Sequence, residues 1–101
     1  MNYIERARAE LWRALADVLP AAGMVWDPME QPGLFDLYTL LLLTFGENVE
    51  SRHVHDAWSV YTMGSRPRHQ SIVPFENLSA EVAAYADPFR DAIRLAAKNL
   101  R

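Results

Sequence analysis

The side chains best able to do chemistry gather in residues 53–75, HVHDAWSVYTMGSRPRHQSIVPF. This segment holds all three histidines (His53, His55 and His69), one of the three tryptophans (Trp58) and a loop with two arginines. Imidazole rings can hold metal ions or move protons, whereas an indole ring beside guanidinium groups can bind an anionic ligand by stacking and hydrogen bonding. Each of these chemistries needs its own residue spacing.

The spacing disfavours both a metal site and catalysis. His53 and His55 are two residues apart, which places them on different sides of a helix, whereas helical ligand pairs lie three or four residues apart. The chain has no cysteine to complete a site. His55 could contact Ser59 one turn later, but no nucleophile elbow, glycine-rich phosphate loop or paired carboxylates accompany them. We therefore expect no metal, no cofactor and no enzymatic activity.

Ligand binding fits the segment better. Trp58 and Tyr61 share one face of the expected helix, and the loop after it supplies further hydrogen-bond donors for a carboxylate or phosphate. A small anionic, nucleotide-like ligand requires this combination. The candidate ligand-binding residues are Trp58, His55, Tyr61, Arg66, Arg68 and His69. The alternative is that Trp58 belongs to the core and that the loop is solvated surface without a ligand.

An amphipathic helix and a loop are predicted for the first third of the chain. Residues 4–19 carry apolar side chains about every 3.6 positions behind Asn2, a candidate N-cap, and the helix should end at Pro20. Residues 21–33 contain prolines and glycines and are interpreted as a surface loop. Within it, Trp26 should cover the edge of the core; the alternative is a stacking platform for a ligand.

Two helices are predicted in the middle of the chain. Residues 34–45 are apolar on nearly all sides, which predicts a central buried helix that stops at Gly46, a suitable left-handed cap position. Ser51 should cap the next helix, which runs to about Met63 and ends at Gly64. This second helix carries the candidate residues up to Tyr61.

The last third predicts a loop followed by helices. Residues 65–74 lack periodicity, with at most a short extended segment at 71–75. Ser79 should begin a short helix, and Asp87 followed by Pro88 should restart one with an acidic cap. A basic stripe follows on the final helix, made of Arg90, Arg94, Lys98 and Arg101. The fold class expected is all-α, a compact single domain of four to five helices.

Length and composition agree with one domain over residues 1–101. The chain is 50% hydrophobic and 23% charged, which suffices for a core without disulfides. Its longest apolar run, within residues 34–45, is too short to span a bilayer, and MNYIERARAE has no signal pattern. With no cysteine present, we expect a cytoplasmic protein without membrane contact.

Charge is distributed unevenly along the chain. The net charge is -3; residues 1–50 hold eight acidic and three basic side chains, whereas residues 51–101 hold five acidic and seven basic ones. A protein that binds DNA regardless of sequence needs a strongly basic face, so we exclude DNA as a partner. A small anionic ligand remains compatible with the basic second half.

Several stretches of the second half resemble the ryanodine receptor repeat, the RyR domain. They are HDAW at 55–58, HQSIVPF at 69–75, NLSAE at 77–81 and the helix at 88–95. The repeat reads roughly His-x-x-Trp, then His-Pro-x-Leu-Val-Pro-Phe/Tyr, then a Leu-Pro/Ser-x-x-Glu segment and a closing amphipathic helix. The likeness covers residues 53–95, and small proteins of actinobacteria and their phages carry a similar VHDAW and SIVPF core. Residues 1–50 would then form a helical N-terminal half before an RyR-like half at 51–101.

The resemblance implies a ligand of the adenine-nucleotide type near Trp58 and His55. Receptor repeats occur in pairs, so a single copy implies a homodimer. Two features depart from the pattern: the Gly-Trp-x-Tyr-Gly segment is replaced by residues 63–66, and Gln70 stands in place of a proline. Arg66 and Arg68 do not come from the repeat.

Two functions therefore fit the sequence. The first is a non-enzymatic RyR-like module that binds a small anionic nucleotide-like ligand, and its resemblance to phage proteins makes a phage one source of it. The second is a protein-interaction or assembly module that docks on a host or phage protein through the acidic half or the basic stripe.

Overall fold

Helices account for all the regular structure of the chain. In the computed structural model, which describes residues 1–101, no strand is present, and the predicted all-α class is confirmed. Residues 71–74 form an irregular loop without a strand, and Phe75 begins a 3₁₀ turn. The elements are α1 (Tyr3–Ala21), α2 (Pro32–Phe45), η1 (Gly46–Asn48), α3 (Ser51–Met63), η2 (Phe75–Asn77), α4 (Ala80–Ala83), η3 (Ala84–Ala86) and α5 (Asp87–Leu100), where η marks a 3₁₀ turn.

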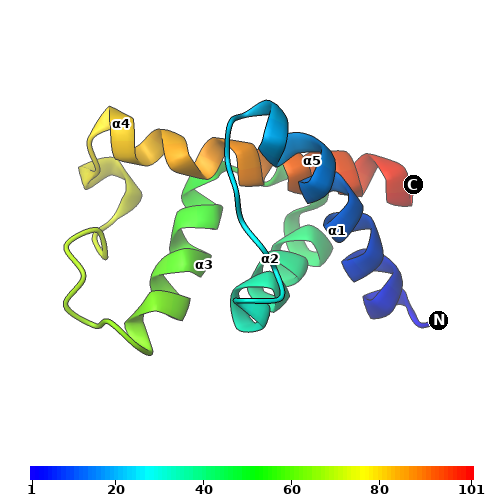
Figure 1. Ribbon diagram of the computed structural model, residues 1–101, viewed down its shortest axis with the longest axis horizontal. Coiled ribbons are helices and arrows are strands. Elements are labelled where there is room, and N and C mark those ends of the chain that lie inside the picture. The colour runs from blue at the N-terminus through cyan, green and yellow to red at the C-terminus, as the bar shows by residue number, and fades with distance from the viewer.

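The last three elements form one rod along the long axis of the molecule. Figure 1 shows α4 leading through η3 into α5, with α1 crossing α5 and with α2 and α3 on one side of the rod. The backbone of Ala86 is already right-handed helical, so α5 starts without a break. The chain is 39 × 25 × 23 Å in extent. α3 thus lies beside η3 and α5, where its ligand-binding candidates can meet other elements.

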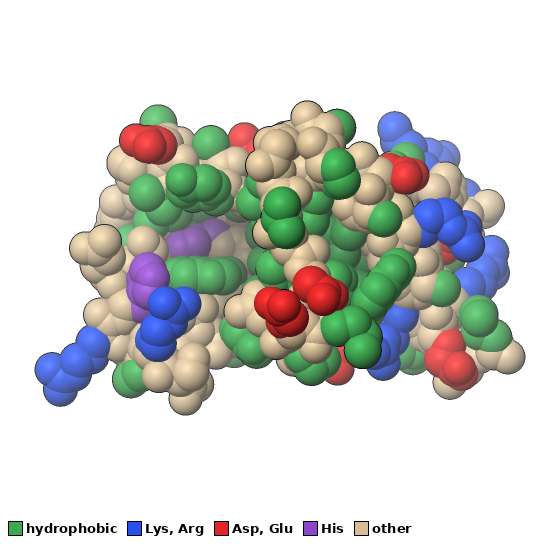
Figure 2. All heavy atoms as spheres, viewed as in Figure 1, with side chains coloured by type: hydrophobic (Ala, Val, Ile, Leu, Met, Phe, Trp, Pro, Cys, Tyr) green, Lys and Arg blue, Asp and Glu red, His purple; other side chains and the backbone are tan.

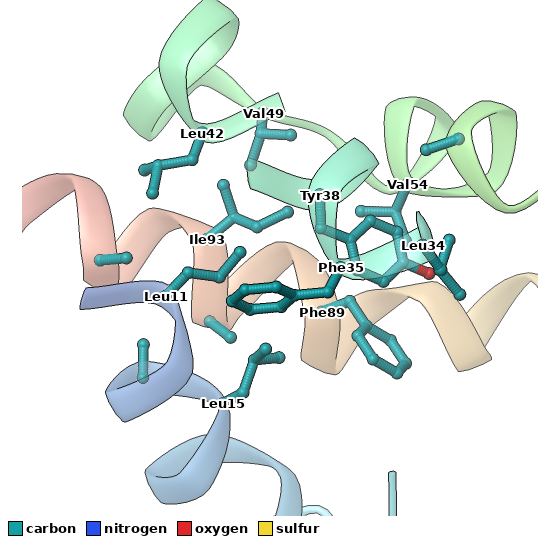
Figure 3. Packing of buried hydrophobic residues seen from close by; sticks show 14 of the residues in the cluster. Leu11, Leu15, Leu34, Phe35, Tyr38, Leu42, Val49, Val54, Phe89 and Ile93 are labelled. Atoms are coloured by element: carbon teal, nitrogen blue, oxygen red, sulfur yellow. The ribbon is translucent and has the colours of Figure 1, made fainter. Parts of the chain in front are cut away.

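The core lies where α1, α2 and α5 meet. Leu11 and Ile93 have no exposed surface, and Figure 3 shows both beside Phe35. The ring of Trp12 packs edge-on against Phe35, with centroids 5.8 Å apart. Apolar burial of this kind is the main favourable term in folding, which explains why the apolar faces of the amphipathic α1 and α5 pack against each other.

α2 is buried on one face only, so the prediction of a helix enclosed on all sides is wrong. Leu34, Phe35 and Tyr38 are buried, whereas Leu40 is 56% exposed and Leu43 is 39% exposed. Three long neighbours cover one side of α2, and a domain of this size has no further helix to cover the other. No helix of the chain combines the length and apolarity needed to cross a membrane.

The first helix begins as predicted and ends one residue later than predicted. Asn2 Oδ1 accepts from the backbone N–H of Glu5 at 2.8 Å, and Glu5 Oε1 accepts from Asn2 N–H at 3.2 Å, which completes a capping box. Pro20 lies inside the last turn, and the helix continues to Ala21. A proline there removes a single hydrogen bond near the end of the helix, where the turn still closes through later N–H groups.

The caps predicted for α3 and α5 are different in the structure. Glu50 is the N-cap of α3, and its N–H donates to His53 Nδ1 at 2.9 Å. Ser51 lies one position later; its hydroxyl donates to Asp87 Oδ1 at 2.5 Å and accepts from Arg90 Nη1 at 3.2 Å. Asp87 therefore ties α5 to α3 and does not cap α5. A hydrogen bond from Arg90 to Asp91 and the nearby charges raise the pKa of Arg90.

Gly46→Ala should lower the free energy of unfolding by about 1–2 kcal/mol. Gly46 has a φ of 56°, a region that side chains with a Cβ rarely adopt. The nearest atom to an added Cβ would be Ala97 Cβ at 3.9 Å, an ordinary contact, so the cost comes from the backbone. Urea denaturation followed by circular dichroism measures this change.

Gly64→Ala is the matched control. α3 ends at Met63 and is followed by Gly64, as predicted, but the φ of Gly64 is -66°, which is right-handed helical. Alanine there should be neutral or stabilise the fold by up to about 1 kcal/mol by restricting the unfolded chain. Equal destabilisation by both substitutions would show that backbone conformation is not the cause.

Candidate ligand-binding cavity

A cavity of about 400 Å³ lies between α3, the α4–η3 segment and the start of α5. Figure 2 shows a recess on this face of the molecule, with apolar side chains around it, histidine side chains in and beside it, and basic side chains next to it. Pockets for small ligands usually measure roughly 300–1,000 Å³. No Asp, Glu, Lys or Arg lines the cavity, and its aromatic walls are Trp26, Tyr38, Trp58, Phe75, Tyr85 and Phe89.

Trp26 forms one wall, as a residue that also covers the edge of the core. Its ring centroid lies 5.8 Å from that of Tyr38 and 5.4 Å from that of Phe89. Its Nε1–H donates to Gln31 Oε1 at 2.6 Å, which fixes the indole in the loop between α1 and α2. This rigid aromatic surface places the first-third loop in the candidate site.

His55 fastens the loop after α3 to the helix. It is 7% exposed, and its Nε2 lies 2.7 Å from the carbonyl oxygen of Val73. A carbonyl only accepts, so Nε2 carries the hydrogen and Nδ1 is left as an acceptor. The imidazole also lies nearly parallel to the indole of Trp58, with centroids 5.7 Å apart and planes at 23°. His55 thus supports both the loop and an aromatic wall.

His53 lies on a different side of α3 from His55. Its ring stacks on Phe45 at 3.9 Å between centroids and caps the helix start as described above. No three His, Asp or Glu side chains of the chain converge in a way that could hold a metal ion.

His69 lines the cavity and has one ring nitrogen without a partner in the protein. Its Nδ1 accepts from the backbone N–H of Ser71 at 3.0 Å, so the hydrogen of the neutral ring is on Nε2. The ring packs edge-on against Trp58 at 5.1 Å between centroids, with planes at 86°. Trp58, held between the two histidines, is half-buried and also packs against the core.

The remaining candidates lie outside the cavity wall. Tyr61 packs against α2, where a Cβ added to Gly33 would lie 3.1 Å from Tyr61 Cε1. Arg66 and Arg68 are exposed in the loop that carries His69, and neither makes an ion pair. Three of the six candidates, His55, Trp58 and His69, therefore meet at the cavity, and the two arginines belong to its surroundings.

Tyr38 is a lining residue that sequence patterns did not suggest. It is 2% exposed and comes from α2, and burial raises the pKa of its phenol. In the sequence it is one more aromatic side chain in an apolar helix. Phe75 and Phe89 also line the cavity, because α3 packs beside η2 and α5.

These features define an all-helical domain with an uncharged aromatic cavity beside a basic loop. The chain belongs to the family described as "Domain of unknown function (DUF7701)", whose model matches residues 2–98. No curated protein and no solved structure matches the chain. The likeness of residues 53–95 to the RyR domain stays a prediction.

Proposed function

We propose that this chain is a non-enzymatic binding module for a small anionic, nucleotide-like ligand, with the planar ring in the cavity and the anionic group at Arg66 and Arg68. One observation carries the proposal: an uncharged aromatic cavity adjoins a loop with two arginines free of ion pairs. Aromatic side chains stack on planar rings, and guanidinium groups bind phosphate and carboxylate through paired hydrogen bonds.

The charge distribution supports this division of the ligand between two environments. No Lys or Arg lines the cavity, so an anion inside it would lose its hydration without gaining an ammonium or guanidinium partner, and such burial is costly. At the exposed loop, an anion keeps contact with water and gains Arg66 and Arg68. A ligand with a neutral ring and a charged tail therefore fits both environments at once.

The hydrogen bonding of His55 supports the non-enzymatic part of the proposal. Ser59 Oγ lies 3.3 Å from His55 Nε2, a spacing that a serine and its general base could share. The same nitrogen donates its hydrogen to the Val73 carbonyl and so has no lone pair for the serine proton. The hydrogen on His55 Nε2 thus serves to hold the loop that carries Val73.

Titration with mono-, di- and cyclic nucleotides should change the tryptophan fluorescence and raise the melting temperature. Trp26 and Trp58 line the cavity, so an occupant alters the surroundings of two of the three indoles. Replacing both Arg66 and Arg68 with alanine should weaken nucleotide binding by about tenfold or more, since hydrogen bonds to charged groups contribute about 1.5–3 kcal/mol each.

Arg52→Ala is the matched control for the arginine variant. Arg52 is an exposed arginine on α3 that pairs with Glu50, so its loss should leave nucleotide affinity unchanged. A flat response across the whole panel at millimolar concentration contradicts the proposal, as does an equal loss of affinity in the Arg52 variant.

The exposed face of α2 favours the second candidate function, a protein-interaction module. Leu40 is 56% exposed and Leu43 is 39% exposed, so both present apolar surface to solvent. A host protein, a phage protein or a second copy of the chain could cover it. Trp58→Ala separates the two functions in a folded variant: nucleotide binding should be lost, whereas capture of a protein through α2 should persist.

A further inference from the structure

We infer that the ligand ring carries a hydrogen-bond acceptor on its buried edge and that the hydroxyl of Tyr38 donates to it. The inference rests on the proposed function and adds which chemical group is recognised inside the cavity. The ligand class that follows is an uncharged heteroaromatic ring with a ring nitrogen or a carbonyl oxygen at its inner edge.

The Tyr38 hydroxyl has no hydrogen-bond partner in the protein. Tyr38 is 2% exposed and lines the cavity, yet none of the hydrogen bonds of the chain involves its oxygen. The one side-chain polar atom that is fully enclosed without a partner is Glu10 Oε2, so the Tyr38 oxygen is not sealed in the core. It therefore reaches the open space that Tyr38 lines.

Neighbouring rings fix the direction of this hydroxyl. The ring of Tyr38 lies 5.3 Å from that of Phe89 and 5.8 Å from that of Trp26, centroid to centroid. Figure 3 shows the Tyr38 oxygen on the side of Leu34, another lining residue, and away from Leu11 and Ile93. The donor is thus held in place before a ligand arrives, and binding requires little reorganisation.

A neutral phenol in this position selects an acceptor. Burial raises the pKa of Tyr38, so the O–H is intact at neutral pH and can donate. The hydroxyl has no partner in the protein and opens onto the cavity, so an acceptor on the ligand would take the place of water there. His69 adds a second donor at Nε2. A hydrocarbon ring would leave both donors unpaired, whereas a charged ring would lack a counter-charge.

Tyr38→Phe tests the inference because it removes the oxygen and keeps the ring. The probes are adenosine, guanosine, cytidine, uridine and their 5′-monophosphates, titrated by calorimetry. The nucleoside that binds best and its monophosphate should both lose about tenfold in affinity, the value of one hydrogen bond. The affinity gained from the phosphate should not change, since Arg66 and Arg68 are intact. The melting temperature of the free variant should be unchanged or higher.

Tyr85→Phe is the matched control. Tyr85 also lines the cavity but is 62% exposed, so its hydroxyl can bond to water, and its loss should leave affinity unchanged. Nucleotide binding that is equal in Tyr38→Phe and the natural chain overturns the inference and leaves the proposed function standing. A lower melting temperature of Tyr38→Phe overturns it too, because the hydroxyl then has a structural partner. No binding of any probe overturns both.

Discussion

Leu11→Ala should lower the free energy of unfolding by about 3–4 kcal/mol, a large share of the roughly 5–15 kcal/mol that stabilises a domain. Leu11 has no exposed surface and lies beside Ile93 and Phe35 at the junction of α1, α2 and α5 (Figure 3). Truncation removes apolar contacts and leaves a cavity that rigid neighbours on three helices cannot fill. Urea denaturation followed by circular dichroism gives the change.

Leu40→Ala is the control for this prediction, since it makes the same substitution in another helix. Leu40 is 56% exposed on the outer face of α2, so its loss should change the free energy of unfolding by less than about 1 kcal/mol. Leucine and alanine have similar helix propensities, which leaves burial as the difference between the two variants. Similar costs at both positions would mean that the outer face of α2 is covered in solution.

Periodicity predicted the helices but not how many neighbours each one has. α1 and α5 are amphipathic, and their apolar faces pack against each other because only one side of each can be buried. α2 is apolar all round, and this composition fits full burial or an uncovered face equally well. The exposure of Leu40 and Leu43 shows which of the two holds. Only the packing of the whole chain decides this.

The N-cap of α3 could not be predicted, because the side chains at this helix start bond to partners that are distant in sequence or of an unusual type. Ser51 is a favourable N-cap by residue type, yet its hydroxyl bonds to Asp87 and Arg90, more than 30 residues away. The backbone N–H of Glu50 donates to His53 Nδ1 at the start of the helix. A local sequence pattern contains neither interaction. The predicted start of α3 was therefore right to within one residue, but the predicted N-cap, Ser51, was wrong.

The candidate site could be predicted only where it is contiguous in sequence. His55, Trp58 and His69 come from one segment, and the turn after α3 brings them together at the cavity. Tyr38 and Phe89 reach the same cavity from α2 and α5, and no spacing rule connects them with the histidines. Tyr61 is a candidate that does not line the cavity. It lies on α3 near Trp58, as predicted, but its ring packs against α2 beside Gly33.

His55→Ala should release residues 64–74 from α3 and raise amide hydrogen exchange there by about tenfold or more. The bond from His55 Nε2 to the Val73 carbonyl joins this loop to the helix. Other hydrogen bonds of the loop are local turns, such as Arg66 N–H to Thr62 O and Ile72 N–H to His69 O. Losing a buried hydrogen bond costs about 1–3 kcal/mol. Because about 1.4 kcal/mol changes an equilibrium constant tenfold, the loop should open, and its amides exchange, about tenfold or more often.

Nucleotide binding should be lost with the loop, because the loop carries His69 and leads into Phe75, both of which line the cavity. His53→Ala provides the control, two residues earlier on the same helix. His53 stacks on Phe45 and accepts from Glu50 N–H, so its loss should raise exchange at the start of α3 and leave residues 64–74 protected. If both variants expose the loop equally, α3 unfolds as a whole and His55 is not its specific tether; if neither does, the turns alone hold the loop closed.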